Sequence, residues 1–188
     1  MKIDKITLEI LKNHSRAAAE GMAYTLYRTA HSTFVKETED FTCGITTPDG
    51  ETFASPVELG VTWFVGLNYK TVIEMIDEYE EGDICITNDP YSGHVSTHSP
   101  DMHCWKPVFF GGELVSFVVG HIHNTDVGGA VPASIPEHFQ KSIRKAYEFL
   151  PPRLYDVESL TRKFWISCLL MYVCQSKIGA ISKHKLRL

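Results

Sequence analysis

The sequence has no pattern that stabilises a chain through disulfides or carries it into a membrane. Its five cysteines are an odd number with scattered spacing and no C-x-x-C pair, so they do not form a disulfide framework. The N-terminus MKIDKITLEI lacks the apolar core of a signal peptide, and the longest apolar-rich run, FWISCLLMYVC, is too short to cross a bilayer. These absences predict a cytoplasmic protein with reduced thiols and no membrane contact.

Further absences limit the chemistry. The net charge of −5 gives no electrostatic footprint for nucleic acid. Because no G-x-x-x-x-G-K-[ST] loop is present, ATP binding by this chain is not expected, and nucleotide chemistry would have to come from a partner. The HExxH motif of zinc hydrolases is absent. The HxHxDH motif fails because Asp126 is one position too late and Val127 stands where a histidine is expected.

Two stretches have the spacing of helices. Apolar residues recur with a helical period from Asp4, a candidate N-cap, to Ala30. The same spacing returns over residues 62–82, where Gly82 is a stop signal.

Three other stretches have the pattern of strands. Residues 40–55 alternate around the turn Pro48-Asp49-Gly50 and predict a β-hairpin, and residues 105–124 predict a second one around Gly111-Gly112. Residues 83–89 predict a short buried strand that leads into a histidine-rich loop, in which prolines and glycines exclude regular structure. Together the elements predict an α+β fold: a mixed, largely antiparallel sheet with flanking helices, forming part of a larger subunit fold.

Histidine is concentrated in one part of the chain. Five of the nine histidines fall between His94 and His123, in the segments GHVSTHSPDMH and GHIHNTDVGG. His98 and Asp101 are three positions apart in a loop pinned by Pro100, so both can face one ion.

The second segment offers a choice of ligands. His121 and His123 alternate at the end of a predicted strand and point to the same side, and Asp126 follows in a turn. Two histidines and one carboxylate leave coordination positions open for substrate or water, which is typical of a catalytic metal site. The alternative is a set of polar loop residues whose hydrogen bonds are satisfied by the backbone. The concentration of histidines, acids and glycines favours the metal site.

Four stretches together resemble the hydantoinase B/oxoprolinase family in order and spacing. They are YRTAHSTFVKETEDFTCGITTPDGETFA, GDICITNDPYSGHVSTHSPDMH, WKPVFFGGELVSFVVGHIHNTDVGG and PPRLYD. The family includes the B-type component of N-methylhydantoinase, the corresponding half of 5-oxoprolinase and the alpha subunit of acetone carboxylase. The resemblance is good over residues 1–133, patchy over 134–158, and ends there.

The resemblance implies a function that the residues alone do not define. Members are several times longer than this chain, and they work with an A-type partner that binds ATP and phosphorylates a substrate or co-substrate. The B-type subunit holds a divalent metal, which is manganese in the acetone carboxylase branch, with zinc or iron as alternatives here. Carried onto this sequence, the metal ligands are His98, Asp101 and His123. The substrate is a small cyclic amide or a ketone, and no nucleic acid or membrane takes part.

Other positions receive weaker predictions. His121 and Asp126 are the candidate catalytic residues: the imidazole carries protons, and Asp126 orients a ligand histidine from outside the coordination sphere. His94 and His103 are further candidate proton carriers.

Four residues nearer the N-terminus have alternative interpretations. Lys36, Glu37 and Asp40 either line the pocket or form a buried ion network. Cys43 is expected to be a core residue rather than a nucleophile, because no base stands beside it.

The composition changes near the end of the chain. Residues 1–158 are predicted to be the N-terminal part of a hydantoinase B-like metal-binding domain. Residues 159–188 contain no Asp or Glu against six Lys and Arg, and we interpret them as an atypical tail of a truncated or out-of-frame product, with a genuine C-terminal helix as the alternative.

Three functions therefore remain open. The chain is a subunit that acts with an ATP-using partner and is inactive alone, a self-sufficient metallo-hydrolase, or an inactive truncated remnant.

Overall fold

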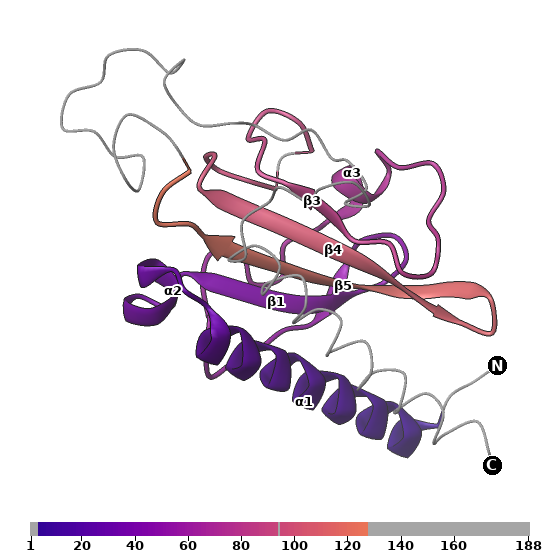
Figure 1. Ribbon diagram of the computed structural model, residues 1–188. Coiled ribbons are helices and arrows are strands. Elements are labelled where there is room, and N and C mark those ends of the chain that lie inside the picture. Colours follow the sequence, from indigo (N-terminus) through magenta and orange to yellow (C-terminus); the bar gives the residue numbers. More distant parts are fainter. Residues whose placement is uncertain (1–3, 94, 128–188) are drawn as a thin grey trace.

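The protein is described here by a computed structural model that defines residues 4–93 and 95–127. Its centre is a five-stranded antiparallel sheet in the order β2-β1-β5-β4-β3, with helices packed on it (Figure 1). This confirms the predicted α+β class. The elements are α1 (Lys5–Thr29), α2 (Thr33–Glu37), β1 (Phe41–Thr46), β2 (Thr52–Ala54), α3 (Lys70–Ile73), β3 (Cys85–Thr87), β4 (Asp101–Phe110) and β5 (Glu113–His123). Within the described residues, no helix is both long and apolar enough to span a bilayer.

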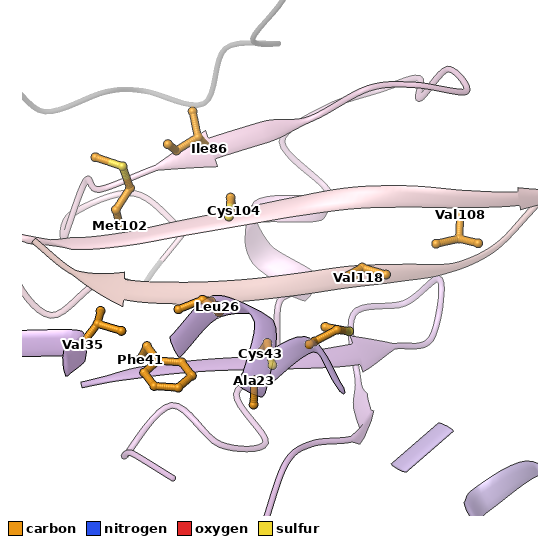
Figure 2. Close-up of a cluster of buried hydrophobic side chains, with 11 residues drawn as sticks. Ala23, Leu26, Val35, Phe41, Cys43, Ile86, Met102, Cys104, Val108 and Val118 are labelled. Carbon is orange, nitrogen blue, oxygen red and sulfur yellow. The ribbon is translucent and has the colours of Figure 1, made fainter. Parts of the chain in front are cut away.

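Helix α1 covers one face of the sheet. It begins where sequence analysis expected, because the Asp4 side chain accepts a hydrogen bond from the Thr7 backbone nitrogen at 2.9 Å and caps the first turn. Its buried stripe is part of the larger hydrophobic cluster, which also contains side chains from four strands (Figure 2). The buried members are Met22, Ala23, Leu26, Val35, Phe41, Cys43, Ile86, Met102, Cys104, Val108 and Val118. Cys43 is therefore a core residue, as predicted.

A second cluster covers the opposite face. Trp105 and Val119 point away from α1 because neighbouring strand residues alternate between the two faces. They pack with Tyr69, Val72 and Phe117 from the segment around α3 and from β5. The sheet is thus buried on both faces, and the second face carries the residues of the candidate site.

The helix predicted over residues 62–82 is wrong in extent, since only Lys70–Ile73 is helical. Gly66 adopts a left-handed conformation with φ of 77° and interrupts the helical path. The segment is instead tied to the first hairpin: Tyr69 N donates to Gly50 O at 2.9 Å, and the Thr52 hydroxyl donates to Leu67 O at 2.6 Å. Tertiary hydrogen bonds have overridden a helical apolar pattern.

The strand predictions hold, with one correction. Both hairpins and the short strand form where they were predicted. However, β4 begins at Asp101, within the loop that was expected to be irregular, rather than at Trp105. Pairing with the long β5 extends β4 back to Asp101, so Asp101 and His103 are strand residues.

Gly50 is expected to tolerate no side chain. Its φ is 85°, and a Cβ there would overlap the Lys70 backbone nitrogen and lie 2.7 Å from Lys70 Cα. Gly50→Ala should lower the free energy of unfolding by about 2 kcal/mol or more, measured by urea denaturation. Gly112→Ala is the matched control, because Gly112 has φ of 87° but nothing within 4 Å of the added carbon. Equal losses in the two variants would contradict a steric origin.

Candidate metal centre

The pairing of β4 with β5 creates the candidate site. Asp101 lies opposite His123, and His103 lies opposite His121, at the end of the two strands where β4 begins and β5 ends. All four side chains lie on the face that carries Trp105 and Val119, because they are an even number of residues from them. Two polar rows, Asp101 with His123 and His103 with His121, therefore lie beyond the apolar second cluster on the same face of the sheet.

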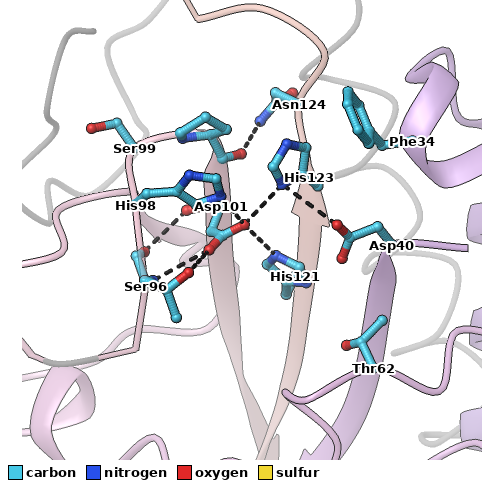
Figure 3. Close-up of polar contacts among 12 residues, drawn as sticks. Phe34, Asp40, Thr62, Ser96, His98, Ser99, Asp101, His121, His123 and Asn124 are labelled. Carbon is cyan, nitrogen blue, oxygen red and sulfur yellow. Dashed lines mark hydrogen bonds and ion pairs between the residues drawn. The ribbon is translucent and has the colours of Figure 1, made fainter. Parts of the chain in front are cut away.

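The Asp101 carboxylate is the centre of this site (Figure 3). Its Oδ1 lies 3.1 Å from His123 Nδ1, 3.2 Å from His98 Nε2 and 3.3 Å from His121 Nε2. Its Oδ2 accepts hydrogen bonds from the Thr97 hydroxyl and the Thr97 backbone nitrogen. The loop from His98 to Asp101 is closed by a hydrogen bond from Asp101 N to His98 O at 2.9 Å, which directs both side chains to the same place.

The surroundings keep this carboxylate ionised. Burial by itself raises the pKa of Asp101, but hydrogen bonds from His121, His123, His98 and Thr97 outweigh it and hold the pKa well below the usual range. The site therefore provides one fixed negative charge beside three imidazoles.

The site has an open edge and a closed one. The His98 side chain is 25% exposed, whereas those of Asp101 and His123 are 3% and 7% exposed, so solvent reaches the group from the His98 side. On the closed side, the ring of Phe34 in α2 packs on the His123 ring with centroids 4.4 Å apart.

Asp40 is the second carboxylate at this site. Its Oδ2 lies 3.5 Å from His123 Nδ1, and its backbone oxygen accepts from His123 N at 3.0 Å. Sequence analysis had left Asp40 between a pocket role and an ion network. Its position just before β1, the strand that pairs with β5, was the signal that places it beside His123.

A second polar row lies behind the first. His103 is fully buried, and its Nδ1 lies 3.0 Å from the Tyr69 hydroxyl. The Phe64 ring packs against both His103 and His121, with centroids 4.9 Å and 4.1 Å away. Burial, reinforced by His121 and opposed by Asp101, lowers the pKa of His103 well below its usual value. His103 is thus a neutral interior imidazole, and no sequence signal pointed to its contacts with Tyr69 and Phe64.

Other sequence candidates lie elsewhere. Asp126 is exposed and lines a pocket with Ala30, His31 and Ser32 rather than joining the group around Asp101. The Lys36 ammonium donates to the carbonyl oxygens of Tyr27 and Arg28 at the end of α1. Lys36 therefore caps a helix rather than lining the site. Glu37 is exposed, and His94 lies outside the described residues.

The donor set fits a divalent metal ion. His98, Asp101 and His123 each offer one ligand atom, and these atoms lie within 4.8 Å of one another. Two imidazoles with a carboxylate suit Mn²⁺, Fe²⁺ or Zn²⁺. His123 Nε2 is also buried without a hydrogen-bond partner among the described residues. The structure brings together the three residues that the resemblance names as ligands, and their role as ligands stays a prediction.

The chain matches a known protein family over most of its length. The family model described as hydantoinase B/oxoprolinase matches residues 4–172, so the chain belongs to that family. The match runs beyond residue 158, where the resemblance had been expected to end.

Two curated relatives illustrate the family. The chain is 37% identical over 169 residues to 5-oxoprolinase 1 of Arabidopsis thaliana, which covers 85% of this chain and 13% of that protein. It is 29% identical over 139 residues to the B-type component of a putative D-/L-hydantoinase of Pseudomonas sp. strain NS671, covering 71% of this chain and 23% of that protein. The chain therefore spans a quarter or less of the length of these two relatives.

Two solved structures share the fold. The ATP-dependent caprolactamase of Pseudomonas jessenii aligns over 98% of this chain and 35% of its own, with a TM-score of 0.78 and 22% identity. The nucleotide-free acetone carboxylase aligns over 97% of this chain and 27% of its own, with a TM-score of 0.77 and 18% identity. At these identities the likeness supports the fold alone.

Proposed function

We propose that this chain is the metal-binding N-terminal part of a hydantoinase B or acetone carboxylase alpha-type subunit. It acts with an ATP-using A-type partner in the hydrolysis of a cyclic amide or the carboxylation of a ketone. The observation that carries the proposal is the convergence of His98, His121 and His123 on one buried carboxylate oxygen of Asp101. The relative named as a hydantoinase component motivates the partner subunit, and the two solved structures, which are named as ATP-dependent enzymes, motivate the reaction class.

In this proposal His98, Asp101 and His123 hold one divalent ion, with manganese favoured and zinc or iron as alternatives. Asp40 is placed to complete the protein ligands or to orient His123. Such an ion, when bound, supplies a Lewis acid that polarises a carbonyl or phosphoryl oxygen. The chain's own residues hold the charge in place: Thr97 fixes one carboxylate oxygen, and Phe34 shields His123.

The catalytic roles of His121 and Asp126 stay predictions. The His121 side chain is buried and reaches Asp101, so the geometry favours an action through that carboxylate rather than on a substrate. Asp126 would have to act from the exposed pocket beside His31 and Ser32. The three cysteines among the described residues are buried, and the proposed cytoplasmic location stays a prediction.

One observation favours a second candidate function. The three-residue ligand group lies wholly within this chain, which is what a self-sufficient metallo-hydrolase requires. The inactive-remnant alternative predicts instead that the chain binds no metal tightly.

Metal binding is the direct test of the proposal. The purified chain should bind one Mn²⁺ or Zn²⁺ per molecule, and His98→Ala should abolish stoichiometric binding because one of three ligands is lost. At a metal concentration of about 100 Kd, the wild type should gain about 2.7 kcal/mol of stability, which a thermal-shift assay measures.

The control is His31→Ala, which removes an exposed histidine near the same end of β5 but outside the ligand group. This variant should bind metal like the wild type. Tight stoichiometric binding by a variant with all three ligands changed to Ala would show that these residues are not the ligands.

A further inference from the structure

A buried run of polar side chains leads away from Asp101 into the protein. His121 Nε2 lies 3.3 Å from Asp101 Oδ1. The rings of His121 and His103 are 4.7 Å apart, and the Tyr69 hydroxyl lies 3.0 Å from His103 Nδ1. Tyr69, His103 and His121 are each at most 1% exposed. Hydrogen bonds thus link Asp101 with His121 at one end of the run and His103 with Tyr69 at the other. The two imidazoles in the middle are not hydrogen-bonded to each other.

The two ends of the run determine which ring nitrogens carry protons. A tyrosine hydroxyl can both donate and accept. When Tyr69 donates to His103 Nδ1, a neutral His103 ring carries its proton on Nε2. The Asp101 carboxylate only accepts, so His121 donates to it from Nε2. In the neutral form of the His121 ring, Nδ1 then keeps an acceptor lone pair.

The remaining nitrogens complement each other. His103 Nε2, a donor, and His121 Nδ1, an acceptor, are both buried without a hydrogen-bond partner among the described residues, and so is the Thr42 hydroxyl. Thr42 and His103 are the cross-strand neighbours of His121 on β1 and β4, so the three side chains form one row on one face of the sheet. Leaving three such groups unpaired in a protein interior is costly. A buried water commonly makes about three hydrogen bonds to groups of this kind.

We propose that His103, His121 and Thr42 form a binding site for a single internal water molecule. The water accepts from His103 Nε2 and donates to His121 Nδ1, with the Thr42 hydroxyl as its third partner. It completes a hydrogen-bonded chain from Tyr69 to Asp101, in which Tyr69, His103 and His121 are positioning residues for the carboxylate. The Phe64 ring lies against both imidazoles and excludes bulk solvent. The consequence for metal affinity rests on the proposed function, whereas the water site and the proton positions do not.

Proton positions and the water are measured without any metal. In the whole 188-residue chain, long-range ¹H–¹⁵N correlation spectra should show a neutral His103 ring protonated on Nε2. A high-resolution crystal structure should show one water bonded to His103 Nε2, His121 Nδ1 and Thr42 Oγ1. A His103 proton on Nδ1, or an empty space between the rings, overturns the proposal even if the metal site is confirmed.

Variants test the positioning role. Tyr69→Phe should remove the preference of His103 for its Nε2 proton, whereas Tyr79→Phe, which removes another tyrosine hydroxyl of the second face, should leave the His103 signals unchanged. His121→Leu should weaken Mn²⁺ or Zn²⁺ binding by about 10-fold to 100-fold, and His121→Gln, whose amide still donates to Asp101, should recover most of it.

Unchanged metal affinity in His121→Leu overturns the positioning role. Failure of the wild type to bind metal would instead contradict the proposed function, and the spectra and the water would still decide the chain of hydrogen bonds.

Discussion

Asp101→Asn is expected to weaken binding of Mn²⁺ or Zn²⁺ by at least about 100-fold, more than loss of any residue that only supports a ligand. The substitution keeps the shape of the side chain but removes the one negative charge on which three imidazoles and Thr97 converge. An amide oxygen is a weaker ligand for a divalent ion than a carboxylate, and the amide NH₂ would face groups that now donate to Asp101. Isothermal titration with the metal alone measures the loss.

The same variant should also lower the stability of the metal-free protein. Hydrogen bonds to a charged acceptor contribute about 1.5–3 kcal/mol each, so we expect a loss of about 2 kcal/mol in the free energy of unfolding at neutral pH. Asp49→Asn is the control, since it removes the same charge from an exposed turn and should change neither property. Metal affinity of Asp101→Asn within threefold of the wild type would exclude Asp101 as a ligand, since even an outer-shell partner is typically worth about tenfold.

The local part of the site could be predicted from the sequence. His98 and Asp101 are three positions apart, and this spacing alone predicted that their side chains face the same place. The choice between His121 and His123 could not be made in this way, because both lie on the same face of β5. The register of β4 against β5 pairs Asp101 with His123 and brings a His123 nitrogen into the group with His98 and Asp101. That register depends on the whole hairpin.

The features that local spacing could not place depend on contacts between distant segments. Asp40 reaches the site because β1 pairs with β5, and Tyr69 reaches His103 because its segment is hydrogen-bonded to Gly50. The same hydrogen bonds to the first hairpin explain why the helix predicted over residues 62–82 was wrong in extent. The apolar residues of this mostly irregular segment pack in the second cluster. Local periodicity predicts which residues are buried more reliably than it predicts whether their backbone is helical or irregular.

The isolated chain is expected to give no ATP-dependent turnover, the largest effect that the proposed function predicts. The sequence has no phosphate-binding loop, and the chain spans 35% and 27% of the two ATP-dependent enzymes that share its fold. Product formation should be measured from a hydantoin, from 5-oxoproline and from acetone with bicarbonate. Each assay is run with and without ATP and with and without an A-type partner, and Asp101→Asn is assayed in parallel.

Turnover only when ATP and the partner are both present, and lost in Asp101→Asn, is the result that the proposed function requires. Hydrolysis by the chain alone, without ATP but still lost in Asp101→Asn, would overturn it in favour of the self-sufficient metallo-hydrolase. No product under any condition, together with no tightly bound metal in the wild type, would identify an inactive remnant. Asp101 separates the three outcomes because the first two need its charge and the third does not, since the polar site would then remain only as part of the fold.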